Sequence, residues 1–139
     1  MTLDFERRAL QLMVGVLTLI PLYVGLRSLF GGPAWIGGVT AVPVDLDSHF
    51  RYLSGLFVGL GIGFASCVPH IEWRGGRFRL LGGIVIAGGI GRLLSYFAVG
   101  EPSHGQMIGL AIELVVVPLL LLWQAALHSR WRRLRMPIV

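Results

Sequence analysis

Charged side chains lie within or beside the long apolar segments of this sequence, where they are costly. Seven residues share this property: Arg27, Arg51, Arg92, Asp45, Asp47, Glu101 and Glu113. Inside a membrane, ionisable side chains pair with one another or mark a functional site. We therefore expect either an ion-paired network that fixes the register of helices or a polar pocket for a small or amphipathic ligand.

Helical spacing groups these residues with further polar side chains. Asp47 and Arg51 are four residues apart, so they share one face of a helix. Arg92 and Ser95 share a face of a later helix, and Glu113 belongs to the next helix. The candidate ligand-binding or ion-pair cluster is Arg51, Arg92, Glu113, Asp45, Asp47, His49, Tyr52 and Ser95.

Catalysis by this cluster is a weaker interpretation. His49 lies near two aspartates and is the candidate general base, and Glu113 is the candidate general acid. The sequence contains no nucleophile elbow, P-loop or H-E-x-x-H motif. It has a single cysteine and no zinc-ligand spacing. A haem held by His70 and His128 is the least favoured interpretation, because both histidines are equally typical of residues at the membrane interface. We expect no metal and no cofactor, and a protein that is not an enzyme.

Four apolar stretches carry these residues. The chain has 139 residues, of which 55% are hydrophobic and 14% charged; soluble domains have about 25% charged residues. A membrane-spanning helix needs about 20 apolar residues. The predicted spans are 9–29, 49–69, 80–99 and 106–127. Pro21 and Pro118 should kink their helices. The predicted fold is all-α, a single membrane domain over 1–139 with up-down topology.

The distribution of arginine predicts the orientation. Nine of the twelve basic residues, all arginine, lie before the first span, between the second and third, or after the fourth. The other two loops contain none. By the positive-inside rule both termini are cytoplasmic, which indicates a multi-pass protein of the bacterial inner membrane. Anionic lipid headgroups are the expected partners of these arginines, and nucleic acid is not.

Arg92 and Glu113 are predicted to face each other. Each lies about 10 Å below the outer boundary, because both are about seven residues from the outer end of their helices. A lone charge at this depth costs about 2.5–3.5 kcal/mol. The inner halves of the helices are almost wholly apolar, which disfavours a channel.

Glycines at four-residue spacing predict close helix packing. Gly55, Gly59 and Gly63 follow one face of the second span, and Gly83 and Gly91 follow one face of the third. Small residues allow helix backbones to approach in a membrane. We expect the second and third helices to touch there, unless these faces bind a protein partner or a second copy of the chain.

The motif D-L-D-S-H-F-R-Y-L-S-G (45–55), the segment G-R-L-L-S (91–95) and Glu113 before Pro118 resemble a bacterial family of small four-helix membrane proteins, a domain of unknown function. The architecture is also similar to that of DoxX-like membrane proteins. The resemblance covers helix one to Gln124 and implies that these are motif residues. It implies no reaction or ligand.

Three functions remain open at this point. The first is a non-enzymatic protein with an outward-facing pocket for a lipid, a quinone-like molecule or an anionic metabolite. The second is an accessory subunit of a larger membrane complex. The third is a membrane-embedded isomerase or other lipid-modifying enzyme.

Overall fold

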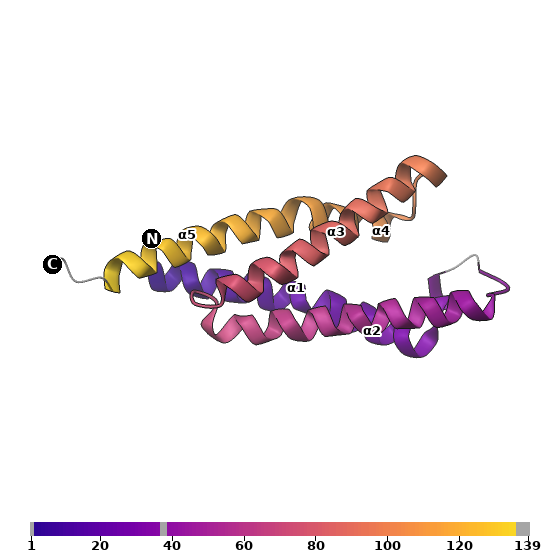
Figure 1. Cartoon of the computed structure of the whole chain (residues 1–139), viewed down its shortest axis with the longest axis horizontal. Coiled ribbons are helices and arrows are strands. Elements are labelled where there is room, and N and C mark those ends of the chain that lie inside the picture. Colours follow the sequence, from indigo (N-terminus) through magenta and orange to yellow (C-terminus); the bar gives the residue numbers. More distant parts are fainter. Residues whose placement is uncertain (1, 37–38, 136–139) are drawn as a thin grey trace. The chain divides into compact units, whose positions relative to one another are not determined.

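The computed structural model describes residues 2–36 and 39–135, which contain helices and no strand. Three long helices, labelled α1 to α3 in Figure 1, are followed by a fourth that a π-helical turn divides into α4 and α5. They are α1 (Leu3–Gly31), α2 (Val44–Cys67), α3 (Gly75–Val99), and α4 (His104–Ala111) joined through the π turn (Ile112–Val116) to α5 (Val117–Arg135). Short 3₁₀ turns at Pro33–Ile36 and Val68–His70 follow α1 and α2.

Each predicted span coincides with one of these helices, the second continuing from α2 into the 3₁₀ turn at Val68–His70, and all four helices are long and apolar enough to cross a membrane. The prediction of an all-α, four-helix membrane protein is confirmed. The helices are longer than the predicted spans, because the apolar window marks only the part that hydrocarbon covers. The fourth, for example, extends from His104 to Arg135, where only 106–127 was expected.

The helices group into two compact units. The terminal unit is Met1–Gln11 with Pro69–Val139, and the hairpin unit is Leu12–Val68. The Arg-rich segments expected on one side of the membrane all fall in the terminal unit, where Arg130 Nη1 lies 2.7 Å from Glu6 Oε1. The end of the Arg-rich tail, 136–139, is outside the described residues. The single domain and the cytoplasmic termini stay predictions.

Glycine allows α1 and α2 to pack closely in the hairpin unit. A Cβ at Gly25 would lie 2.8 Å from Val58 Cγ2 and 3.1 Å from the Val58 nitrogen. A Cβ at Gly61 would lie 2.9 Å from Leu22 Cδ2. In the terminal unit Gly82 and Gly89 likewise allow α3 to pack closely against the helix that follows it.

The glycines selected from the sequence are different ones. A Cβ at Gly59, Gly83 or Gly91 would meet no described atom of its own unit within 4 Å, and one at Gly55 would meet only Leu29, at 3.9 Å. Four-residue spacing identifies a small-residue face but not its neighbour, so other glycines make the close contacts within each unit. The predicted contact of α2 with α3, including that at Gly63, involves two different units and stays a prediction.

Changing Gly25 to alanine is expected to lower the free energy of unfolding by about 1–2 kcal/mol, because the new methyl group would overlap Val58 Cγ2 at 2.8 Å and crowd the Val58 nitrogen at 3.1 Å. Gly15 on the same helix is the matched control, since a Cβ there has nothing within 4 Å. Thermal unfolding of the full chain in a mild detergent compares the two variants. Equal stability of Gly25→Ala and Gly15→Ala would contradict this packing.

Candidate functional site

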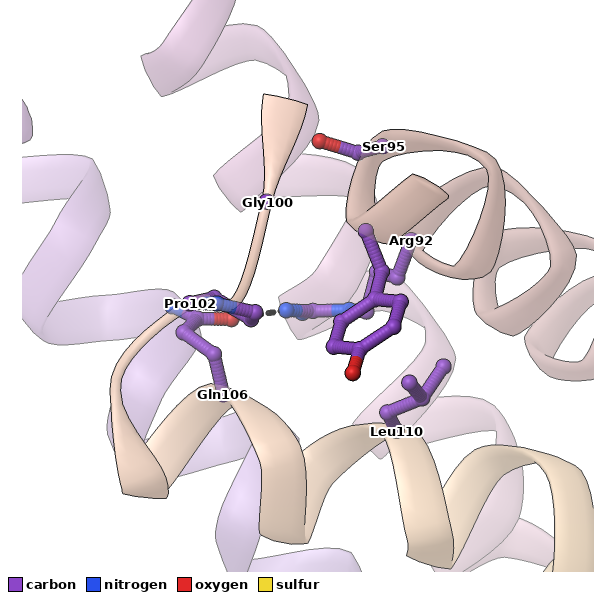
Figure 2. Close-up of a pocket in the computed structure, with 7 residues that line it drawn as sticks. Arg92, Ser95, Gly100, Pro102, Gln106 and Leu110 are labelled. Atoms are coloured by element: carbon purple, nitrogen blue, oxygen red, sulfur yellow. Dashed lines mark hydrogen bonds between the residues drawn. The ribbon is translucent and has the colours of Figure 1, made fainter. Parts of the chain in front are cut away.

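A pocket of about 230 Å³ lies between α3 and the start of α4, within the terminal unit (Figure 2). We call it the α3–α4 pocket. It is partly open, and its lining is Arg92, Ser95, Tyr96, Gly100, Pro102, Gln106 and Leu110. Figure 2 shows the Arg92 side chain extending from α3 toward Gln106 on α4, with Leu110 one turn further along. Two of the residues chosen from the sequence, Arg92 and Ser95, therefore line this pocket.

The π-helical turn holds Glu113 next to this pocket. Val117 donates its N–H to the carbonyl of Ile112, five residues earlier, instead of four. Pro118 follows directly and has no N–H to continue the α-helical pattern, which explains why the wider turn occurs here. A π turn rotates the side chains before it relative to those after it, and such turns are frequent at functional sites. A π turn thus precedes Pro118, whereas α1 continues as an α-helix through Pro21, and the kinks expected at both prolines stay predictions.

The expected pair of Arg92 and Glu113 is present. Arg92 Nε lies 3.1 Å from Glu113 Oε2, and the Glu113 side chain is only 11% exposed whereas that of Arg92 is 41% exposed. Glu113 Oε2 accepts no hydrogen bond from the described residues, so charge rather than an aligned hydrogen bond holds the pair. Arg92 also donates a hydrogen bond from Nη1 to Gln106 Oε1.

Gly89 lets α3 approach the π turn. A Cβ there would lie 2.9 Å from Glu113 Cβ and 2.8 Å from Leu114 Cδ2. Gly89 stands three residues, almost one turn, before Arg92, so the same face of α3 carries the close approach and the ion pair. Sequence reasoning selected Gly91 and missed Gly89, because the partner of each glycine is visible only in the folded chain.

Arg51 and Asp47 form a second pair, in the hairpin unit. Arg51 Nε donates to Asp47 Oδ2 at 2.7 Å, and Arg51 Nη1 donates to the carbonyls of Leu29 at 2.8 Å and Phe30 at 2.9 Å. The last carbonyls of a helix have no partner within it. Arg51 therefore caps the end of α1, with Asp47 holding its guanidinium in place. Gly32 has a φ of +66°, and a Cβ there would lie 2.7 Å from Arg51 Nη2.

The remaining candidates of the hairpin unit are more exposed. Asp45, His49 and Tyr52 are exposed, and the rings of His49 and Tyr52 lie 6.4 Å apart. Arg27 donates to the Tyr23 hydroxyl at 3.1 Å and lies 5.2 Å from the centre of the Trp35 ring. The predicted cluster is thus divided: Arg92, Ser95 and Glu113 in one unit, and Arg51, Asp45, Asp47, His49 and Tyr52 in the other. That these groups form one pocket stays a prediction.

Sequence reasoning missed a buried polar cluster at the far end of the terminal unit. We call it the Glu72 cluster: Glu6, Arg7, Glu72, Gln124, His128 and Arg130. Glu72 is 3% exposed and Gln124 is fully buried. Gln124 Nε2 donates to the Ile71 carbonyl at 2.8 Å, and Arg7 Nη1 lies 3.4 Å from Glu72 Oε1. A lone glutamine in the run V-V-V-P-L-L-L-L-W-Q was the available signal, and Gln124 is the one member of the cluster that lies within a predicted span.

His128, one of the two histidines considered as haem ligands, belongs to the Glu72 cluster. Its Nδ1 lies 2.6 Å from the Glu72 carbonyl, which accepts, so Nδ1 carries the proton. The Trp73 ring packs edge-on against the His128 ring, with the two ring centres 5.9 Å apart. His70 is exposed. Among the described residues, no group of three or more histidine, cysteine, aspartate or glutamate side chains is placed to hold a metal ion.

The comparisons with known proteins assign most of the chain to a family. A family model described as Domain of unknown function (DUF4345) matches residues 9–124, whereas no curated protein and no solved structure matches. The matched range includes Arg51, Arg92 and Glu113 and excludes the Arg-rich end of α5. The role of the motif at residues 45–55 as a family signature and the similarity to DoxX-like proteins stay predictions. Because the match covers most of the sequence, this four-helix membrane protein belongs to the DUF4345 family.

Proposed function

We propose that this protein binds a small or amphipathic ligand in the α3–α4 pocket and does not transform it. The observation that carries the proposal is Arg92, an arginine within a membrane-spanning helix whose side chain is 41% exposed and lines a concavity. The ion pair with Glu113 involves Nε, and Nη1 donates to Gln106, so these contacts use only part of the guanidinium. The exposed remainder is available to a ligand.

The size and lining of the pocket support a headgroup or a small molecule. Pockets that enclose a whole drug-sized ligand have volumes of about 300–1,000 Å³, and this one has about 230 Å³. Pro102 and Leu110 offer apolar surface beside Arg92 and Gln106. A ligand with a polar head and an apolar body matches this combination, with the body extending into the lipid. In the orientation that the arginines predict, the pocket lies toward the outer side of a bacterial inner membrane.

The proposal predicts that Arg92→Leu loses a bound molecule that the wild-type chain retains. The tagged full chain is purified in a mild detergent, and small molecules are identified by mass spectrometry. We expect one enriched amphiphile in the wild type and at least about a tenfold reduction in Arg92→Leu, as for the loss of a charge-assisted hydrogen bond. Arg27→Leu is the matched control, because Arg27 is also an arginine near a helix end but contacts Tyr23 and Trp35 outside the pocket.

The same purification tests the accessory-subunit alternative. A stoichiometric protein partner that survives washing, with no enriched small molecule, would favour that function. The glycines that contact nothing within their own unit, such as Gly83 and Gly91, are then the faces to substitute. A chemically altered amphiphile in cells that contain the wild type, but not Arg92→Leu, would instead favour a lipid-modifying enzyme.

A further inference from the structure

The polar groups of the α3–α4 pocket are mainly hydrogen-bond donors. A guanidinium has five N–H groups and no acceptor. The described partners of Arg92 are Gln106 Oε1, which accepts from Nη1, and Glu113 Oε2, which lies beside Nε. The second Nη1 hydrogen and both Nη2 hydrogens have no partner among the described residues. No carboxylate lines the pocket.

The orientation of the Gln106 amide follows from this contact. Because Arg92 has only donors, the Gln106 atom that faces it must be the oxygen. The Gln106 NH₂ group is then a further donor without a partner among the described residues. The hydroxyl groups of Ser95 and Tyr96 also line the pocket and can donate.

The pocket carries no net charge while Arg92 and Glu113 are paired. Glu113 lies outside the lining, but its carboxylate is 3.1 Å from Arg92 Nε and offsets the positive charge. An anionic head would add an uncompensated negative charge in a low-dielectric region and would lie near the Glu113 carboxylate. A neutral head with acceptor oxygens would use the free donors without this cost.

We infer that the α3–α4 pocket takes a neutral amphiphile whose head carries carbonyl oxygens, of the ester or ketone type. This inference rests on the proposed function and adds the chemical class of the ligand. The carbonyl oxygens accept from Arg92 and from the amide of Gln106, and the apolar body lies against Pro102 and Leu110. The ion pair with Glu113 excludes anionic lipids, so it sets specificity by charge.

Three probes with equal chain lengths separate the possibilities. Dioctanoylglycerol is neutral and has two ester carbonyls, dioctylglycerol keeps the free hydroxyl but has ethers in place of the esters, and dioctanoyl phosphatidic acid has a phosphate in place of the hydroxyl. Binding to the full chain in a nonionic detergent is measured from the shift of the thermal unfolding midpoint in titrations. We expect the diester to bind about tenfold more tightly than the other two, as for one hydrogen bond to a charged group.

Glu113→Gln provides the second test. It removes the compensating charge but keeps the size of the side chain, so the affinity for the phosphatidic acid should rise about tenfold relative to the affinity for the diester. Gln106→Leu should lower the affinity for the diester, because it removes the amide donor and leaves the charges of Arg92 and Glu113 in place. This variant replaces Glu113→Gln as the test if Glu113→Gln does not fold.

The outcomes separate this inference from the proposed function. Tighter binding of the phosphatidic acid than of the diester by the wild-type chain would overturn the neutral ligand class, and so would equal binding of the diester and the diether. The pocket would keep its proposed function if a co-purified molecule is lost in Arg92→Leu. Absence of both probe binding and any co-purified molecule would overturn the two together.

Discussion

Changing Arg92 to leucine is expected to lower the free energy of unfolding in detergent by about 3 kcal/mol. The substitution leaves the Glu113 carboxylate, with its side chain only 11% exposed, without a counter-charge in a membrane-spanning helix. Glu113→Leu should cost less, because the Arg92 side chain is 41% exposed and keeps its hydrogen bond to Gln106. Thermal and denaturant unfolding of the full chain measure both losses.

The double variant Arg92→Leu with Glu113→Leu should be more stable than the sum of the single losses predicts, because it leaves no unpaired charge. A coupling of about 1–2 kcal/mol is expected for a partly exposed pair. Arg92→Leu combined with Glu72→Ala is the control pair: both residues belong to the terminal unit but have different partners, Glu113 and Arg7, so the losses should add. Full additivity at Arg92 and Glu113 would show that the pair contributes no coupling.

The double variant also separates structure from function. If the pair served only to fix helix register, a stable double variant would retain every property of the wild type. If Arg92 binds a ligand, the double variant is stable and still loses the co-purified molecule. Measurements on the double variant alone therefore distinguish the structural ion pair from the ligand-binding pocket.

Changing Glu72 to alanine is expected to lower the free energy of unfolding by about 2 kcal/mol. Glu72 is 3% exposed, and Arg7 Nη1 lies 3.4 Å from its Oε1, so the substitution leaves Arg7 without this counter-charge and opens a small cavity. Glu72→Gln keeps the shape and the acceptor and should cost about half as much. Unfolding of the full chain in detergent gives both values.

Glu101→Ala is the matched control for Glu72→Ala. Glu101 is exposed, and exposed substitutions change stability by about 0.5 kcal/mol or less. Equal effects of the two alanine variants would show that the Glu72 cluster does not stabilise the start of α1 against the connection of α2 to α3. A larger effect of Glu72→Gln than of Glu72→Ala would also contradict the ion pair.

Hydrophobicity by itself determined the number and approximate position of the four spans. Each needs about 20 apolar residues, and this requirement does not depend on neighbouring helices. The pairs Asp47–Arg51 and Arg92–Glu113 were also predictable: the first from its spacing of four residues, and the second from equal depth on consecutive helices. Both follow from the geometry of a single helix or of one helical hairpin.

Only the tertiary structure decided which glycines pack, what Arg51 contacts and where Gln124 lies. Gly25 and Gly89 differ from Gly15 and Gly91 in their neighbours, and a neighbour belongs to another helix. Arg51 reaches carbonyls 22 and 21 residues earlier, at the end of α1. The π turn before Pro118 changes the direction of Glu113 relative to α5, and no helical wheel with a constant period shows it. Local periodicity thus determines the elements, whereas long-range contacts determine what their side chains do.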